Sequence, residues 1–189
     1  MIINIGRELA AGGRQTGKRL AEELGYRYFD KEIVIEAGRR SGISAEAFER
    51  ADENCNRFLT GLLSFDRQLF ELQSEVILEL ASGGDCIFVG RCADYILREK
   101  ECLNVFLRAE QGDRIARLMV GEGIGEDAAR DLIRQTDEHR QRYYNFYTGK
   151  RWGDSRSYDL CINTSLWGVE GTVELIKLAA KTKNTGKNT

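Results

Sequence analysis

Apolar residues along the chain follow two alternating patterns. Short apolar runs typical of β-strands occur at 2–5, 26–29, 86–89, 103–107 and 160–163. Each run is followed by a segment in which apolar residues recur every three or four positions, as in a helix, and this alternation predicts a parallel sheet. The run 86–89 is apolar at every position, as expected of a strand that helices cover on both faces. We therefore predict a three-layer α/β fold with about five parallel strands.

Two regions between the predicted strands are helical in pattern. An insert at about 31–82 carries apolar residues at helical spacing, which favours a packing surface over a cofactor groove, although a dimer face is an open alternative. The segment 126–150 is highly charged and typical of a helix that projects from the core. Residues 181–189 lack apolar side chains and are predicted to be a disordered tail. Residues 1–180 are predicted to form a single domain.

Length and charge narrow the class of protein. A chain of 189 residues and 21.4 kDa fits one domain with a full hydrophobic core. Lysine and arginine number 28 against 30 acidic residues, a net charge of −2, which excludes a basic surface that coats a nucleic-acid polymer. No apolar run approaches the roughly 20 residues that cross a bilayer. We expect a cytoplasmic protein with no membrane partner.

The cysteines do not suggest a metal site or a disulfide framework. Their number is odd, their spacing is scattered, and His139 is the only histidine in the sequence. Cys86 and Cys161 lie in apolar runs, so we expect both thiols to be small core residues. We expect His139 to be exposed on its helix, with no catalytic role.

A glycine-rich turn lies between the first predicted strand and the first helix. Gly12 and Gly13 let the backbone approach a phosphate, and the amides from Gly12 to Thr16 stand at a helix N-terminus, where the helix dipole attracts anions. Arg14 adds positive charge, and the Thr16 hydroxyl can face Mg²⁺. Compared with G-x-x-x-x-G-K-[ST], however, Glu8 stands at the first glycine and Arg14 at the lysine.

From this spacing alone, two other interpretations of the turn are open. The glycines can simply begin a packed helix. A nicotinamide-binding loop is also conceivable because Asp30 ends the second strand, but the glycine spacing does not fit that class. We therefore place nicotinamide binding below phosphoryl transfer.

Several motifs together give a family resemblance. They are Gly13-Arg14-Gln15-Thr16, Gly90-Arg91, Arg114-x-x-Arg117, Asp137-Glu138-His139-Arg140, and the string 143–154 with Tyr158-Asp159-Leu160 after it. With these motifs, the chain from Ile2 to about Ala180 resembles the cytidylate kinase-like family, in the nucleoside monophosphate kinase branch of P-loop proteins. The resemblance implies a P-loop kinase fold, in which the insert at about 31–82 lies on the acceptor side and a helical lid spans about 110–150.

The resemblance also implies roles for individual residues. Arg14 takes the place of the lysine that binds phosphate, and Arg114 and Arg117 match arginines that close over the donor. Asp137 would help to read the base. Cys92 stands where the family has an aspartate after Arg91, and Asp94 follows two positions later. The expected catalytic residues are Arg14, Arg91, Arg114, Arg117 and Arg140. The expected ATP contacts are Gly12, Gly13, Arg14, Gln15 and Thr16, with Thr16 also the ligand of Mg²⁺. The expected acceptor contacts are Asp30, Arg91, Asp94, Asp137 and Arg140.

Some of these residues also have a purely structural interpretation. Arg114 and Arg117 can form one solvated helix face, and Asp137 with Arg140 can be a surface ion pair. Asp30 can cap the following helix. The aromatic residues of 143–152 can stack on a base or pack the lid.

The sequence therefore favours ATP-dependent, Mg²⁺-dependent phosphoryl transfer to a small nucleotide, first a nucleoside monophosphate such as CMP. A nucleotide-binding regulatory module without phosphotransfer is the main alternative, and a kinase of a different small molecule is another. A homodimer is compatible with either function.

Overall fold

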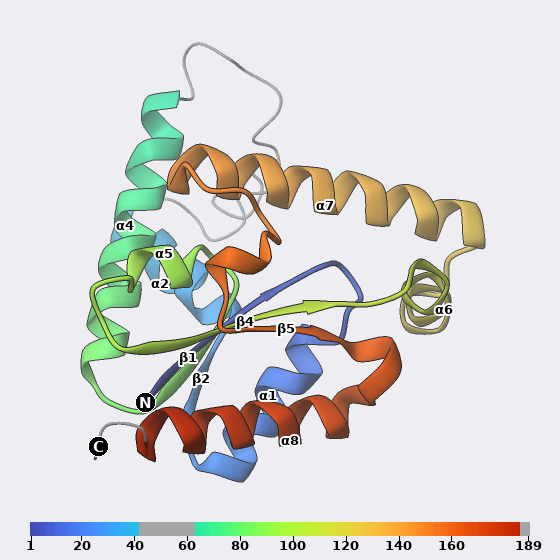
Figure 1. Cartoon of the computed structure of the whole chain (residues 1–189). Coiled ribbons are helices and arrows are strands. Elements are labelled where there is room, and N and C mark those ends of the chain that lie inside the picture. The colour runs from blue at the N-terminus through green and yellow to red at the C-terminus, as the bar shows by residue number, and fades with distance from the viewer. Residues whose placement is uncertain (42–62, 186–189) are drawn as a thin grey trace.

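A five-stranded parallel sheet forms the centre of the computed structural model, which describes residues 1–41 and 63–185 (Figure 1). The strands are β1 (Ile2–Arg7), β2 (Arg27–Phe29), β3 (Cys86–Val89), β4 (Cys102–Arg108) and β5 (Leu160–Asn163). They lie in the order β2-β3-β1-β4-β5, and every neighbouring pair is parallel. The predicted α/β class and the five predicted strands are confirmed.

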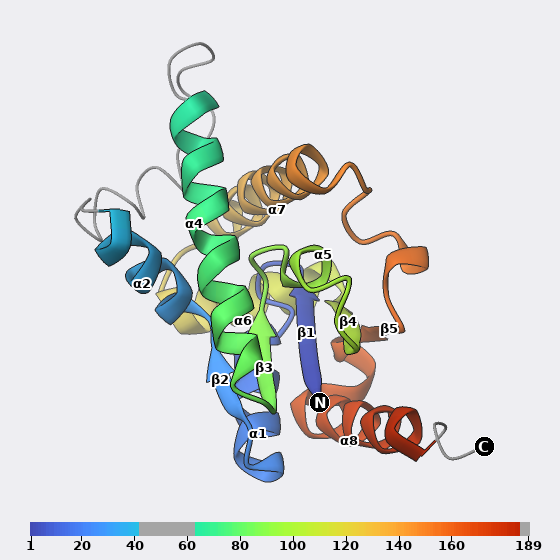
Figure 2. The ribbon, with the colours of Figure 1, turned by 90° about the vertical axis from the view of Figure 1, so that its left-hand side faces the viewer.

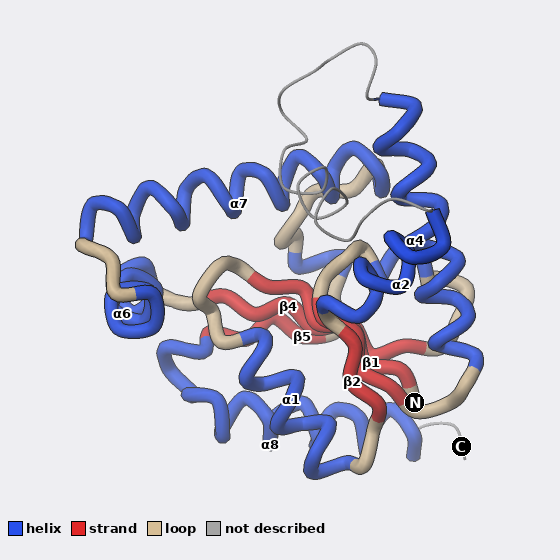
Figure 3. The backbone as a smooth tube through the Cα atoms, turned by 180° about the vertical axis from the view of Figure 1, so that it is seen from behind, coloured by secondary structure: helices blue, strands red, loops and turns tan. Residues whose placement is uncertain are grey.

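Helices cover both faces of this sheet (Figures 1 and 2). Helices α1 (Gly13–Leu24) and α8 (Thr164–Thr185) lie on one face. On the other face lie α2 (Lys31–Ser41), α4 (Leu63–Ser82) and the short α5 (Ala93–Ile96). Helix α6 (Gln111–Glu122) follows β4, and α7 (Glu126–Thr148) runs back above the face that carries α4 and α5 (Figure 3). A short 3-10 helix, Ser155–Ser157, precedes β5. No helix within 1–41 and 63–185 has the length and apolar character of a membrane span.

Strand β1 shows how helices bury both faces of a strand. Ile3 and Ile5 are fully buried in a cluster with Leu20 of α1, whereas Ile2 packs in a second cluster with Val76 of α4. Because successive side chains of a strand point to opposite faces, each layer of helices receives its own row of apolar residues.

The structure describes two parts of the predicted helical insert. Both described parts of the insert, α2 and α4, are helical, and α4 buries Val76 and Ile77 against the sheet. The apolar positions Phe58, Leu59 and Leu62, and Cys55, lie outside the described residues.

The prediction of a disordered tail from 181 is wrong for 181–185, because α8 continues to Thr185. Lys183 Nζ donates to the Cys102 carbonyl at 2.7 Å and to Asp159 Oδ2 at 3.0 Å, which fixes this last turn to the sheet.

The two cysteines predicted to lie in the core differ in burial. Cys86 is buried in β3, an inner strand, whereas Cys161 is exposed in β5, which lies at the edge of the sheet. The expectation for Cys161 is therefore wrong. Among the described residues, no cluster of histidine, cysteine and carboxylate side chains could hold a metal ion by itself.

The packing of α1 on the sheet predicts a strong effect at Gly17. A Cβ at this position would lie 2.9 Å from Val89 Cγ2 and 3.0 Å from Tyr28 Cε2. We expect Gly17→Ala to lower the free energy of unfolding by about 1 kcal/mol, because the overlap outweighs the better helix propensity of alanine. A Cβ at Gly121 in α6 meets no atom within 4 Å, so Gly121→Ala should instead raise stability by about 0.5–1 kcal/mol. Urea unfolding of both variants tests this, and a stabilised Gly17→Ala variant would contradict the described packing of α1.

Candidate active site

The turn after β1 presents a helix N-terminus to the carboxyl edge of the sheet. Gly12 adopts a left-handed conformation with φ of 79°, and α1 begins at the next residue. Residues from Gly13 to Gln15 therefore lie in the first helical turn, whose amides have no intrahelical acceptor and carry the positive end of the helix dipole, whereas the Thr16 amide donates to the Gly12 carbonyl at 2.9 Å. Thr16 is fully buried, and its Oγ1 atom has no hydrogen-bond partner in the described structure. This turn has the features of a phosphate seat with one hydroxyl beside it.

A cavity of about 320 Å³ opens at the carboxyl ends of β1 and β3, beneath α7. Four arginines line it, from four different segments: Arg7 at the end of β1, Arg14 on α1, Arg91 after β3 and Arg140 on α7. Ligands of open α/β sheets bind at the carboxyl ends of strands. We call this cavity the arginine cleft. The remaining polar lining residues are Asn4, Asp30, Asp94, Thr136 and His139, with Tyr143, Tyr144, Trp152 and Tyr158 as the aromatic ones.

Asp30 is the buried carboxylate at the floor of this cleft. Its Oδ2 atom accepts a hydrogen bond from Arg14 Nε at 2.9 Å, and its Oδ1 atom lies 3.7 Å from Arg7 Nη2. Burial lowers the pKa of Arg7 to about 9, and the charges of Arg140 and Arg91 add to this effect while Asp30 opposes it. Burial also lowers the pKa of Arg140. The cleft therefore holds more positive charge than its carboxylates balance, which favours an anionic ligand.

Aromatic side chains and Asp94 form another part of the lining. Tyr144 Oη donates to Asp94 Oδ2 at 2.6 Å. Burial raises the pKa of Asp94, and burial with the nearby Asp94 charge raises the pKa of Tyr144 and of Tyr158. The rings of Trp152 and Tyr158 pack on Phe106, with centroid distances of 5.4 and 5.0 Å. This wall offers flat rings together with polar groups that can donate and accept hydrogen bonds.

The neighbouring tyrosines Tyr143 and Tyr147 pack against Phe70 of α4. The Tyr147 and Phe70 rings stack with centroids 4.1 Å apart, and Tyr143 meets Phe70 edge-on. Part of the tyrosine cluster therefore holds α7 to α4, while Tyr144 faces the cleft.

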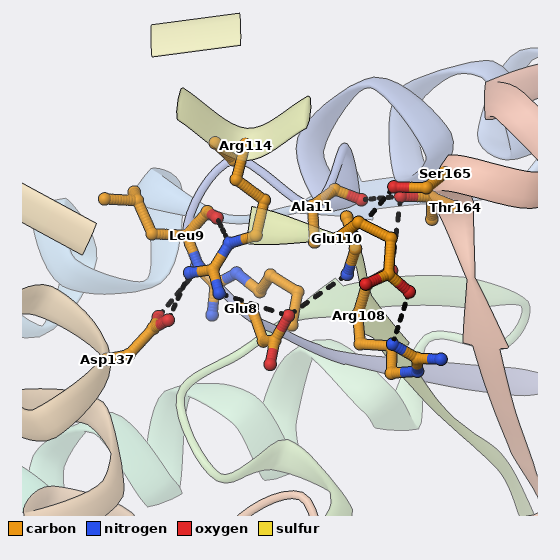
Figure 4. Close-up of polar contacts among 12 residues, drawn as sticks. Glu8, Leu9, Ala11, Arg108, Glu110, Arg114, Asp137, Thr164 and Ser165 are labelled. Atoms are coloured by element: carbon orange, nitrogen blue, oxygen red, sulfur yellow. Dashed lines mark hydrogen bonds and ion pairs between the residues drawn. The ribbon is translucent and has the colours of Figure 1, made fainter. Parts of the chain in front are cut away.

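Arg114 and Asp137 form a separate network that fixes the turn after β1 (Figure 4). Arg114 is buried, pairs with Asp137, and donates from Nε to the Leu9 carbonyl at 2.7 Å. The Leu9 amide in turn donates to Asp137 Oδ1 at 2.8 Å. Glu8 Oε2 lies 3.3 Å from Arg114 Nη1 and accepts from the Ala109 amide at 3.1 Å. These contacts join the turn to α6, α7 and the end of β4.

Arg117 holds the other side of the same turn. Its Nη1 atom donates to the Ala10 carbonyl at 2.9 Å and to Thr164 Oγ1 at 3.3 Å. A Cβ built on Gly12 would lie 4.0 Å from this nitrogen, so the Arg117 guanidinium stands beside the phosphate seat.

The structure thus divides the predicted site residues into two groups. Arg14, Asp30, Arg91, Asp94 and Arg140 line the arginine cleft. Gly12, Gly13, Gln15, Thr16 and Arg117 belong to or touch the turn, whereas Arg114 and Asp137 support it from outside the cleft lining. Their roles in catalysis and binding stay predictions.

Two features of the cleft were missed from the sequence. Arg7 is the last residue of a central strand, and Gly90-Arg91 directly follows β3, so its position at a strand's carboxyl end was the signal that could have identified Arg7. His139, expected to be exposed, is half-buried and lines the cleft, because its helix lies over the sheet edge.

The network around Arg114 predicts that Asp137 is needed for stability. We expect Asp137→Asn to lower the free energy of unfolding by about 3 kcal/mol, because it leaves a buried guanidinium without one of its two carboxylates. Asp131→Asn on the same helix breaks an exposed pair with Arg134 and should change stability by less than about 1 kcal/mol. Urea unfolding compares the two. If Asp137 mainly read a base, Asp137→Asn would keep its stability and lose acceptor affinity instead.

Comparisons with known proteins agree with this geometry. A profile of the cytidylate kinase-like family matches residues 2–166. A cytidylate kinase of Pyrococcus horikoshii is 27% identical over 181 residues, which cover 95% of this chain and 88% of that protein. A solved structure of an uncharacterized protein from Eubacterium ventriosum has a TM-score of 0.74 at 28% identity, covering 95% of this chain and 97% of that one.

Another solved structure, a shikimate kinase from Bacteroides thetaiotaomicron, has a TM-score of 0.61 at 18% identity and covers 96% of this chain and 98% of that one. At that identity the likeness concerns the fold alone, and it confirms the predicted kinase-type architecture. Because the family profile covers most of the sequence, the chain belongs to the cytidylate kinase-like family.

Proposed function

We propose that this protein transfers the γ-phosphoryl group of ATP to a nucleoside monophosphate, with CMP as the first candidate. Membership of the family makes it a phosphotransferase of the nucleoside monophosphate kinase type. The observation that carries the proposal is the convergence of four arginines on one cleft beside the N-terminus of α1. A phosphoryl-transfer site needs such a concentration of cations because negative charge is spread over the transferring oxygens.

The turn after β1 supports the donor half of this proposal. The amides at the N-terminus of α1, from Gly12 to Gln15, suit the phosphates of ATP because they lie at the positive end of the helix dipole, and Arg117 stands beside them. Mg²⁺ usually takes one or two protein ligands and completes its shell with water and substrate phosphates. The buried Thr16 hydroxyl, which lacks a hydrogen-bond partner in the described structure, fits such a ligand. When bound, the ion would neutralise charge on the donor phosphates.

The arginine cleft supports the acceptor half. Arg91 and Arg140 supply planar guanidinium groups that suit a phosphate monoester. Trp152 and Tyr158 offer rings for a base, and the Asp94 carboxyl with the Tyr144 hydroxyl can hydrogen-bond its edge. A ligand with one phosphate and one aromatic base would satisfy both parts of the lining. Cytidine is the first candidate base because the relatives in the comparison are named cytidylate kinases.

The chemistry asks the protein mainly for positioning. Donor and acceptor must lie in line, water must be excluded, and developing charge must be neutralised. The arginines of the cleft come from β1, α1, the end of β3 and α7. An acceptor enclosed between these elements would be held in position, shielded from water and surrounded by positive charge.

A binding module without phosphotransfer is the second candidate function, and one contact favours it. Arg14, at the position of the usual P-loop lysine, is held by Asp30 at 2.9 Å. If this ion pair persisted with ATP bound, Arg14 would not reach the donor phosphates. Arg14→Ala would then leave ATP affinity unchanged, and the wild-type protein would bind ATP without forming a phosphorylated product.

A coupled assay of ADP formation with CMP, dCMP, UMP, AMP and GMP tests the proposal. We expect turnover with at least one pyrimidine monophosphate, and a loss of about 10²-fold in kcat/KM for that acceptor in Arg91→Ala, because the variant removes one phosphate contact. Arg98→Ala is the matched control, since Arg98 is exposed, lies over the Tyr95 ring and does not line the cleft. No turnover with any nucleoside monophosphate, or equal rates for the two variants, would overturn the proposed acceptor site.

A further inference from the structure

Arg7 takes a path through the molecule that two glycines keep open. It is the last residue of β1, and its side chain passes over the first residue of α1, where a Cβ built on Gly13 would lie 2.7 Å from Arg7 Cγ. Its guanidinium reaches the end of β3, where a Cβ built on Gly90 would overlap Arg7 Nη1. Side chains at either glycine would displace the arginine from this path.

This path connects the two halves of the proposed active site. Gly13 begins the helix whose amides form the phosphate seat, and Gly90 directly precedes Arg91 in the acceptor cleft. The backbone that carries Arg7 is fixed by the register of Arg7 with Leu107 of β4, and its carbonyl accepts from Arg140 Nη1 at 3.3 Å. The guanidinium is thus placed by a central strand rather than by a loop, which limits its movement.

Around Arg7, positive charge exceeds negative charge, which favours a bound anion. Its contact with Asp30, at 3.7 Å, is an ion pair too long for a hydrogen bond, and Asp30 shares its single charge with Arg14. Burial lowers the pKa of Arg7, and the like charges of Arg140 and Arg91 lower it further. An anion placed between these guanidinium groups would relieve both effects.

We propose that Arg7 is a catalytic residue that contacts the phosphoryl group during its transfer from donor to acceptor. This inference rests on the proposed function. In the reaction, the bond between the γ-phosphorus and the β,γ-bridging oxygen of ATP breaks, and the electron pair leaves with ADP. A new bond forms between that phosphorus and an oxygen of the acceptor phosphate. Arg7 keeps its proton throughout and stabilises charge on the equatorial oxygens.

Kinetics of Arg7→Ala, Arg7→Lys and Arg108→Ala provide the first test. Arg108 is a matched control because it ends the neighbouring strand β4, is exposed, and does not line the cleft. We expect kcat to fall by about 10²-fold or more in Arg7→Ala and by about 10-fold in Arg7→Lys, with KM for ATP and for the acceptor changed less than about 3-fold. Arg108→Ala should retain wild-type rates. Added guanidinium ion should restore part of the activity of Arg7→Ala, a rescue that a folding defect would not show.

A binding measurement separates this role from the proposed function. Aluminium fluoride imitates the transferring phosphoryl group, so wild-type protein with CMP and Mg²⁺ should bind ADP at least 10-fold more tightly when it is present. In Arg7→Ala this gain should disappear while the affinity for ADP alone is retained. Wild-type turnover with an unchanged kcat in Arg7→Ala, or a full gain from aluminium fluoride in that variant, would overturn the role of Arg7 and leave the proposed function intact. Absence of turnover and of any gain in the wild-type protein would overturn both.

Discussion

One buried carboxylate decides where positive charge gathers in this molecule. Asp30 lies at the end of β2 and is shared by Arg14 from α1 and Arg7 from β1. Without it, Arg7 and Arg14 would face Arg91 and Arg140 across a small cavity whose other carboxyl group, Asp94, is hydrogen-bonded to Tyr144. With it, the cleft tolerates four arginines and still carries a surplus of positive charge. A bound phosphate can supply the missing negative charge. The clustered arginines therefore lower the stability of the ligand-free protein and create its affinity for phosphate.

The molecule uses its arginines in two distinct ways. Arg114 and Arg117 donate to the carbonyls of Leu9 and Ala10, and thereby fix the shape of the turn after β1. The arginines of the cleft, by contrast, line a cavity, where Arg7 and Arg14 share the single carboxylate of Asp30. This division explains why Glu8 can stand at a P-loop glycine position, since its carboxylate binds Arg114 and the Ala109 amide rather than the phosphate seat.

Much of the fold could be predicted from the sequence, because apolar runs without a polar face require helices on both sides of the sheet. Asp30 and Arg91 could be found because they directly follow strands, and ligands of such sheets bind at the carboxyl ends of strands. Arg114 and Asp137 were harder, since their pairing depends on how α6 and α7 pack across the turn, which spacing along one helix does not reveal. Cys161 was misjudged because the position of β5 at the sheet edge follows from strand order, and Lys183 because its partners lie far away in the chain.

The most direct test is a crystal structure with a bisubstrate analogue in which five phosphates join adenosine to cytidine. We predict that the phosphates on the adenosine side bind the amides from Gly12 to Gln15, that the phosphate nearest cytidine binds Arg91 and Arg140, and that Arg7 contacts a phosphate between them. A complex in which the phosphate chain lies outside the cleft, with the turn after β1 contacting no phosphate, would contradict this account.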